Sequence, residues 1–197
     1  MGKTKKRCAW VRAGNTLYEI YHDTEWGVPV HDDRILFEFL ILESAQAGLS
    51  WETILKKRAA YAKAFENFDP NKVAAFTKQD VKRLLQDTGI VRNRLKIESV
   101  IKNAQLFLEI QKRYGSFSKY VWSFVKHRPL DNRRQALENI PAVTKEAETL
   151  SQALKKQGFK FFGPTIAYAF MQAVGLVNDH TRDCFRYQEI KDHSRAS

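Results

Sequence analysis

Two cysteines, the only two in this chain of 197 residues, lie near its opposite ends, and each has a histidine nearby in sequence. Cys8 is followed by His22, and His180 is followed by Cys184. Residues one helical turn apart lie on the same side of a helix, so His180 and Cys184 can face one point. Four nitrogen and sulfur ligands are the set that zinc prefers in closed, structural sites. The pattern predicts one metal site that ties the two ends of the chain together.

The spacing also allows a simpler interpretation, in which two reduced cysteines are buried in the core and the histidines lie on the surface. A disulfide is not expected in a cytosolic protein. Asp179 and Asp183 flank the second pair and could accept hydrogen bonds from ligand histidines. The residues alone leave both interpretations open.

The composition is that of a globular protein, with 44% hydrophobic and 12% aromatic residues. No apolar run approaches the length of a membrane span, and the N-terminus resembles no signal peptide, so we expect a cytoplasmic protein without a membrane segment. The formal net charge of +11 favours an acidic partner, with nucleic acid the first candidate because binding to its phosphates is largely electrostatic.

Periodicity and capping signals predict helices through almost the whole chain. Asp69-Pro70 and Thr77-Lys-Gln-Asp80 are typical helix starts, and Gly158 is a typical helix end. No segment alternates as a half-buried strand does, so we expect an all-α fold, with an irregular loop over 127–143. The expected helices cover about 33–48, a segment from Trp51, a segment from Pro70, about 78–89, a segment from about Arg92, 117–125 and 145–157.

A possible anion site follows the last of these helices. Gly163 and Pro164 sit where a further helix begins, and the next backbone amides would point out of its positive end. Lys160 lies just upstream and would add charge, so a helix–hairpin–helix segment could hold a DNA phosphate. An ordinary corner between two helices explains the same residues. Arg92, Arg94 and Lys96 form a second candidate, which a solvated helix face explains equally well.

Glu43 lies in an apolar helical segment, where a carboxylate needs a hydrogen-bond partner or a function. Glu38, in the same segment, is expected on the exposed face. Aromatic residues are dense around Glu43 and the first metal pair, and they either form an aromatic core or enclose a planar ligand. A basic surface, a phosphate site and an aromatic box with an acid together suggest a nucleobase flipped out of DNA. The aromatic residues concerned are Trp10, Tyr18, Tyr21, Trp26 and Trp51.

Five motifs lie between Cys8 and Cys184: Cys8-Ala-Trp10, Tyr21-His-Asp-Thr-Glu-Trp-Gly-Val-Pro29, Leu42-Glu-Ser-Ala-Gln-Ala-Gly-Leu-Ser-Trp51, Phe159-Lys-Phe-Phe-Gly163 and Gly175-Leu-Val-Asn-Asp-His180. They resemble the motifs of the 3-methyladenine DNA glycosylase I (TAG) family. The resemblance implies an all-α fold of the helix–hairpin–helix DNA glycosylase superfamily. It also implies that Cys8, His22, His180 and Cys184 bind one structural zinc ion that joins the terminal segments.

By the same resemblance, Glu43 is the catalytic residue that contacts the methylated base, and Tyr21 and Trp51 enclose that base. Trp10 and Tyr18 are expected as further walls of the base pocket. Leu49 matches the apolar residue that fills the gap left in the duplex, where the neighbouring bases are unstacked. Ser44-Ala45 departs from the family pattern. The remaining expected DNA contacts are Gly163, Thr165 and Lys160.

The implied activity is hydrolysis of the N-glycosidic bond of 3-methyladenine in double-stranded DNA, which leaves an abasic site. No lysine is placed as a Schiff-base nucleophile, so no strand cleavage is expected. Asn178 stands where many members of the superfamily have an aspartate, and Asp179 receives no catalytic role.

The expected organisation is a flexible basic leader (1–7), one domain of two helical lobes sharing a cleft (8–184) and a C-terminal tail (185–197), in a monomer. Two alternatives stay open, a zinc-stapled DNA-binding module without catalysis and a helix–hairpin–helix glycosylase for another lesion.

Overall fold

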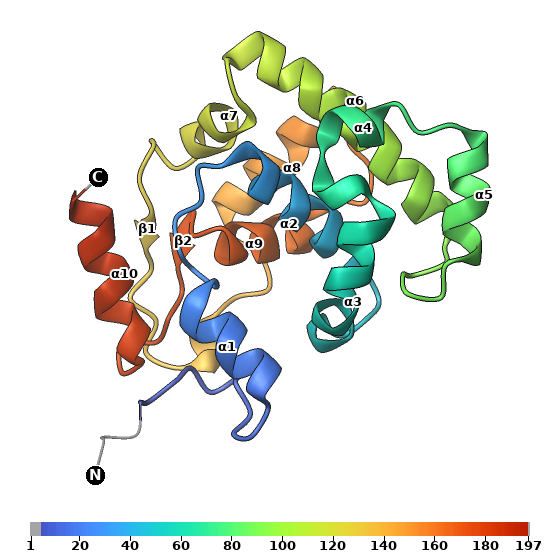
Figure 1. Cartoon of the computed structure of the whole chain (residues 1–197). Coiled ribbons are helices and arrows are strands. Elements are labelled where there is room, and N and C mark those ends of the chain that lie inside the picture. The colour runs from blue at the N-terminus through green and yellow to red at the C-terminus, as the bar shows by residue number, and fades with distance from the viewer. Residues whose placement is uncertain (1–4, 197) are drawn as a thin grey trace.

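The computed structural model describes residues 5–196, and in this part of the chain ten α-helices are accompanied by only two very short strands (Figure 1). The prediction of a mostly helical fold is confirmed. None of the described helices is both long and apolar enough to cross a membrane. The helices are α1 (Thr16–Thr24), α2 (Asp33–Gln46), α3 (Trp51–Ala64), α4 (Pro70–Ala74), α5 (Lys78–Gln86), α6 (Arg94–Tyr114), α7 (Phe117–Ser123), α8 (Lys145–Gln157), α9 (Pro164–Ala173) and α10 (Phe185–Ala196); the 3₁₀ helices are η1 (Glu66–Phe68) and η2 (Leu137–Asn139).

Helix α2 is the central element of the fold. Asp32 caps its start, because the Asp32 side chain accepts hydrogen bonds from the amides of Arg34 and Ile35. Nine of its side chains, between Leu36 and Ala45, are buried, as expected for a helix that is apolar on nearly all sides. It packs against α3, α6, α7 and α9, and these contacts place the end of α2 in the middle of the molecule.

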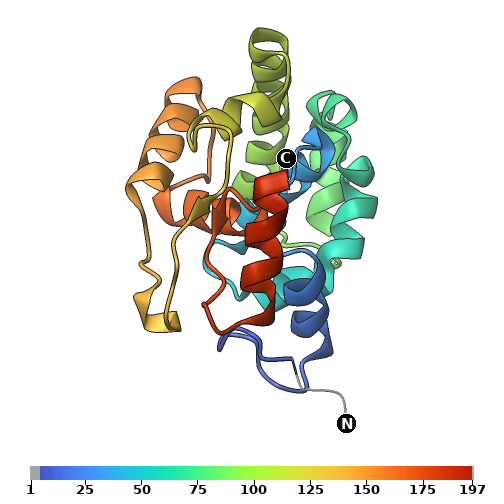
Figure 2. The same cartoon turned by 90° about the vertical axis from the view of Figure 1, so that its left-hand side faces the viewer.

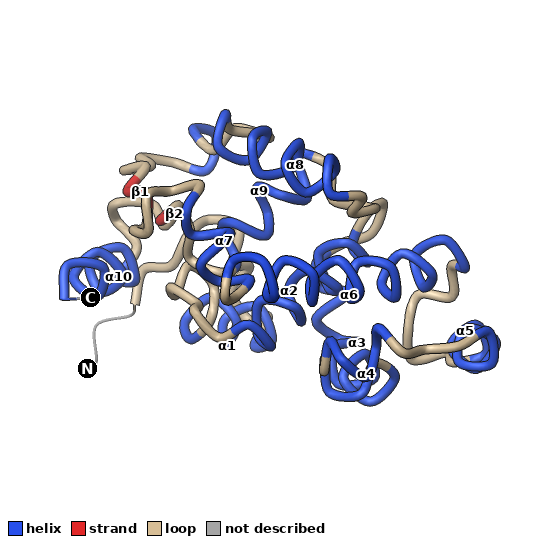
Figure 3. Tube along the Cα trace, turned by 90° about the horizontal axis from the view of Figure 1, so that it is seen from above, coloured by secondary structure: helices blue, strands red, loops and turns tan. Residues whose placement is uncertain are grey.

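The other helices are arranged around α2 so that α5 and α10 lie at opposite ends of the molecule (Figures 1 and 3). Helices α8 and α9 pack against each other as a hairpin. Helix α10 crosses the face that Figure 2 turns toward the viewer. It occupies 185–196 of the predicted C-terminal tail, and residue 197 lies outside the described residues.

The segment predicted as an irregular loop, 127–143, contains β1 (Leu130–Asp131) and η2. Strand β1 pairs in parallel with β2 (Val177–Asn178), with Leu130 opposite Val177. The pairing holds the segment that follows α7 beside the segment that follows α9. Two stretches far apart in sequence are therefore joined just before the second pair of metal-ligand candidates.

Two predicted helix ends were placed too far along the chain. Helix α5 ends at Gln86 rather than at Gly89, because the Asp87 carboxylate accepts the Gly89 amide at 2.7 Å and forms a turn. Helix α7 ends at Ser123 rather than at Val125, because the next amides bond three residues back and tighten the last turn.

The last two residues of the predicted basic leader are anchored, which differs from the expectation of a flexible segment. Arg7 donates two hydrogen bonds to Asp23, at 2.9 and 2.8 Å. Lys6 forms an ion pair with Asp183, and its carbonyl oxygen accepts the Phe185 amide at 2.9 Å. The start of the described chain is thus held to both α1 and α10. Residues 1–4 of the leader lie outside the described residues.

Gly175, just after α9, allows the backbone of Val28 and Pro29 to approach closely. Replacing Gly175 tests this contact. Its φ is +71°, and a Cβ atom there would lie 2.5 Å from the Pro29 nitrogen. We expect Gly175→Ala to lower the free energy of unfolding by about 3 kcal/mol, because a left-handed backbone penalty is added to a clash with backbone. Urea unfolding measures the change. Gly14→Ala, at φ +82° with nothing within 4 Å, should cost only about 1 kcal/mol; equal losses would contradict the proposed clash.

Candidate active site and metal centre

A cavity of about 250 Å³ opens between α1, the ends of α2 and α9, the start of α3 and the η2 segment. It brings together five of the residues predicted for base binding and catalysis with several that the sequence did not indicate. The lining residues are Trp10, Tyr18, Tyr21, Trp26, Glu43, Gln46, Trp51, Leu137, Ile140, Ala169 and Gln172.

Aromatic rings form one side of the cavity. Tyr21 on α1 is buried, and its ring centre lies 5.5 Å from that of Trp51, the first residue of α3. Trp10 lies 5.6 Å from Tyr18 in an edge-to-face arrangement. The Tyr18 hydroxyl accepts the Glu52 amide at 3.1 Å, which fixes the start of α3 beside α1. These contacts fix the positions of the rings around the cavity.

Glu43 is buried in this cavity with only 3% of its surface exposed. Its Oε2 atom has no hydrogen-bond partner among the described residues, and burial raises its pKa to about 8. The indole N–H groups of Trp10 and Trp51 are also buried without a partner in this part of the chain. Unpaired buried polar groups are costly, so one acceptor and two donors around one cavity indicate a site for a planar, polar ligand.

Glu38 lies elsewhere on α2, and the expectation that it is exposed was wrong. Its side chain is only 16% exposed, because Arg58 of α3 covers it and donates a hydrogen bond of 2.6 Å. The same guanidinium group binds Glu25 after α1, also at 2.6 Å. Arg58 therefore joins α2 and α3 to the end of α1, and these three helices carry Glu43 and three of the aromatic residues.

Leu49 stands in an exposed turn beside the cavity, with 41% of its surface accessible. Lys96 of α6 braces this turn, since its Nζ donates to the carbonyl oxygens of Ala45 and Ala47 at 2.8 and 2.6 Å. Lys96 is thus occupied inside the protein and is not a free phosphate contact. Arg94, from the same predicted cluster, pairs with Glu98.

The hairpin between α8 and α9 is fixed from behind and exposed in front. Asn103 of α6 forms two hydrogen bonds with the backbone of Lys160, at 3.0 and 2.9 Å. The Lys160 side chain, Gly163 and Thr165 are exposed. A Cβ atom on Gly163 would meet nothing within 4 Å, and its φ is an ordinary −72°. The protein itself therefore does not require glycine at this position.

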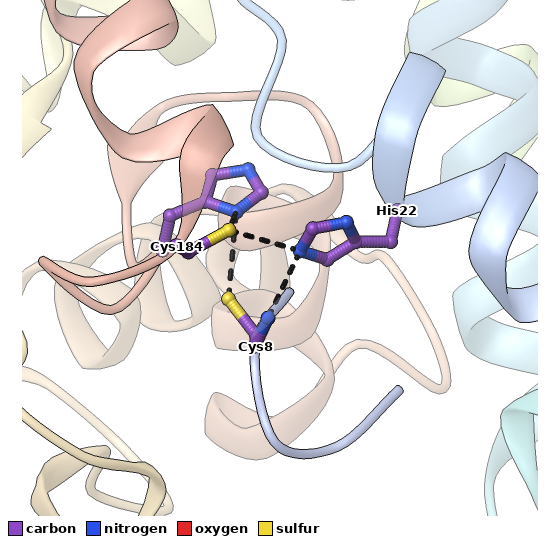
Figure 4. Close-up of side chains that lie close together, drawn as sticks. Cys8, His22 and Cys184 are labelled. Atoms are coloured by element: carbon purple, nitrogen blue, oxygen red, sulfur yellow. Dashed lines mark hydrogen bonds between the residues drawn. The ribbon is translucent and has the colours of Figure 1, made fainter. Parts of the chain in front are cut away.

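Cys8, His22, His180 and Cys184 form one buried cluster, and their ligand atoms all lie within 4.8 Å of one another. The Cys184 sulfur is 3.4 Å from His22 Nε2 and 3.6 Å from His180 Nδ1. Figure 4 shows Cys8, His22 and Cys184 converging from separate segments. The group could hold a metal ion, as the sequence predicted.

The outer nitrogens of the two histidines have partners that suit metal ligands. His22 Nδ1 lies 2.8 Å from a carboxylate oxygen of Asp23, and His180 Nε2 lies 3.0 Å from the Trp26 carbonyl oxygen. Because both partners are acceptors, each outer nitrogen carries the proton and each inner nitrogen keeps a lone pair facing the sulfurs. The acceptors are not Asp179 and Asp183, as the sequence suggested, because those side chains point toward other partners.

Asp179 joins two walls of the cavity. It is buried and accepts hydrogen bonds from Asn132 and Arg134 of the loop and from Tyr168 and Gln172 of α9. Arg134 also donates to the carbonyl oxygen of Asn139 in η2, at 3.0 Å. One carboxylate therefore holds both α9 and the segment that carries Leu137 and Ile140.

Comparison with known proteins agrees with this arrangement. A family model described as methyladenine glycosylase matches residues 10–187. The chain belongs to the methyladenine glycosylase family.

Among characterised proteins, it is 52% identical to DNA-3-methyladenine glycosylase 1 of Escherichia coli (strain K12), over 92% of this chain and 97% of that protein. A solved structure of 3-methyladenine DNA glycosylase I matches with a TM-score of 0.88 and 52% identity, over 91% of this chain and 98% of the other. The 3-methyladenine DNA glycosylase I of Staphylococcus aureus matches with a TM-score of 0.87 and 44% identity, over 91% and 95% of the two chains.

Five lining residues of this family member could not be predicted as parts of the cavity. Leu137 and Ile140 lie in a loop whose sequence has no periodicity. Gln46, Ala169 and Gln172 lie in helices whose sequence pattern gives no sign of a binding site. The one available signal was the spacing of Ala169 and Gln172, which places both on one face of α9. Which cavity that face meets depends on the packing of α9 against α2.

The buried acid makes the stability of the protein depend on pH. Burial raises the pKa of Glu43 from 4.5 to about 8. Between these values the native state holds a proton that the unfolded state has released, so the free energy of unfolding falls as pH rises. We expect Glu43→Gln to be more stable than the parent at pH 8.5 by up to about 4 kcal/mol, and nearly equal to it at pH 5.

Urea unfolding at the two pH values measures this difference. Glu109→Gln, at an exposed position of α6, controls for the substitution itself and should follow the parent. A gap between Glu43→Gln and the parent that is the same at both pH values would contradict the account.

Proposed function

We propose that this chain is a monofunctional DNA glycosylase, which hydrolyses the N-glycosidic bond of 3-methyladenine in alkylated double-stranded DNA and leaves an abasic site. The observation that carries the proposal is the unpaired Glu43 carboxyl in an aromatic cavity of a methyladenine glycosylase family member. A further solved relative, 44% identical, is a 3-methyladenine DNA glycosylase I variant in complex with 3-methyladenine.

The cavity suits a methylated adenine because methylation at N3 gives the base a positive charge. Aromatic faces such as those of Tyr21 and Trp51 attract a flat cation. The cation also favours the ionised form of Glu43, which offsets the burial that raises the pKa of this group. A cationic base is already a good leaving group, so the site needs to extrude the base, hold it and admit water to the sugar.

The exposed residues of the two turns supply the proposed DNA contacts. Leu49 would fill the gap left by the extruded base, and the hairpin would hold a phosphate through Lys160, Gly163 and Thr165. The free amides at the start of α9 suit an anion, and the open space at Gly163 allows a close approach. Helix α6 holds the Leu49 turn through Lys96 and the hairpin through Asn103, so it sets their spacing.

The metal is proposed to be zinc with a structural role. Two thiolates and two imidazoles fill a tetrahedral zinc site and leave no position for a water molecule. Zinc bond lengths place sulfur and nitrogen ligands about 3.6 Å apart across a tetrahedral edge. The sulfur-to-nitrogen distances of 3.4, 3.5 and 3.6 Å suit this geometry. Bound zinc would hold Trp10, Tyr18 and Tyr21 in place and take no part in the chemistry.

Base release from alkylated DNA tests the activity. We expect the parent to release 3-methyladenine, and Glu43→Gln to release it about 10 to 100 times more slowly, because a hydrogen bond to a charged group is lost. DNA affinity should change little, since Glu43 lies inside the cavity. Glu109→Gln is the matched control and should keep full activity.

The same assay separates the alternatives. Binding of DNA without base release would support a non-catalytic module. Release from oxidised but not from alkylated DNA would support another lesion. Full activity of Glu43→Gln would remove Glu43 from the mechanism.

Elemental analysis tests the metal site. We expect about one zinc ion per chain in the parent and a strong loss in Cys184→Ala, together with a fall in Tm of about 10 °C, because metal binding stabilises only the folded state. His127→Ala removes an exposed histidine outside the cluster and should keep the metal. If the parent without metal has the same Tm as the parent with metal, the fold does not depend on the ion.

A further inference from the structure

Gln172 of α9 lines the cavity but has no role in the proposed mechanism so far. It is held at two points. Its backbone carbonyl oxygen accepts the Gly27 amide at 3.0 Å, and its side-chain Nε2 donates to Asp179 Oδ2 at 2.8 Å. The side chain is half-buried, and its amide oxygen Oε1 accepts no hydrogen bond from any residue between 5 and 196. A fixed acceptor without a partner therefore stands at the wall of the cavity.

The orientation of this amide is set by the surroundings of Asp179. A carboxylate accepts hydrogen bonds, so the Gln172 side chain must turn its NH₂ group, and not its oxygen, toward Asp179. The carboxylate also accepts from Asn132 and Arg134 at 2.8 and 3.0 Å, and from the Tyr168 hydroxyl. These donors hold both of its oxygens in place. Asp179 thus determines which end of the Gln172 amide is left for a ligand.

We infer that Gln172, oriented by Asp179, is a specificity-determining residue that selects methylated adenine over methylated guanine. The inference rests on the proposed function. Adenine carries an amino group at C6, which donates hydrogen bonds, whereas guanine carries an oxygen at the same position, which accepts them. The Gln172 amide oxygen pairs with the amino group of adenine and faces the oxygen of guanine without a proton between them. A site built to pair with one group rejects a base that leaves its polar atoms unpaired.

Gln172 and Glu43 thus recognise different features of the base. The Glu43 carboxylate attracts the positive charge of the base. Both N3-methylated purines carry this charge, so the attraction alone does not distinguish adenine from guanine. The Gln172 amide is neutral and discriminates by the direction of its dipole. Asp179 does not line the cavity and acts as a positioning residue.

Two variants test the inference through the ratio of 3-methyladenine to 3-methylguanine released from the same alkylated DNA. Asp179→Asn replaces one carboxylate oxygen by an NH₂ group, which donates to Gln172 Oε1 and turns the Gln172 NH₂ group toward the cavity. We expect the ratio to fall by more than tenfold, because an acceptor for adenine becomes a donor for guanine. Gln172→Met removes the acceptor, and we expect the release of 3-methyladenine to fall about tenfold while that of 3-methylguanine does not fall.

Gln105→Met, on the exposed face of α6, is the matched control and should leave both rates unchanged. Metal content and Tm are measured for every variant, because Asp179 precedes the metal-ligand candidate His180. If Asp179→Asn does not fold, Gln172→Met carries the test alone. An equal fall in the release of both bases would show a merely structural role and overturn the inference. A parent that releases no 3-methyladenine would instead overturn the proposed function, and the inference with it.

Discussion

The convergence of Cys8, His22, His180 and Cys184 determines where the N-terminal part of the site can lie. Trp10, Tyr18 and Tyr21 stand between the first two of these residues in sequence, so fixing Cys8 and His22 fixes the aromatic wall of the cavity. The outer hydrogen bonds to Asp23 and to the Trp26 carbonyl extend this constraint into α1 and the turn that follows. The cluster therefore positions the aromatic wall of the cavity, although none of its four residues lines the cavity itself.

The cavity keeps polar groups that a core selected for stability alone would pair or replace. Among residues 5–196, one oxygen of Glu43 and two indole N–H groups nearby have no hydrogen-bond partner, and the pKa of Glu43 is raised to about 8. Such groups destabilise the free protein and are satisfied by a ligand that is cationic, flat and polar at its edge. The charged side chains around these groups, by contrast, are hydrogen-bonded. Asp179 accepts four hydrogen bonds, and Arg58 joins two carboxylates, so the walls stay rigid while the centre stays unsatisfied.

Local signals predicted the elements well where one residue decides the backbone geometry. Asp69 and Thr77 cap helices as expected, because a side-chain oxygen binds an amide only two or three residues away. Predictions about partners were weaker. Lys96 braces a turn of α2, Glu38 pairs with Arg58, and Asp179 turns toward Gln172 and not toward a metal ligand. Each of these partners comes from a distant segment, and spacing along the chain carries no information about it.

The sequence by itself determined a helical protein, a Cys and His set at its two ends and an acid in an apolar helix, because periodicity, residue type and local caps are properties of short segments. The motifs that resemble a glycosylase family added the expected roles of Glu43 and the aromatic residues. Only the tertiary structure decided which groups share the cavity. The contribution of η2, the unpaired Glu43 oxygen and the orientation of the Gln172 amide arise from the packing of α9 and the loop around Asp179, which joins residues far apart in the chain.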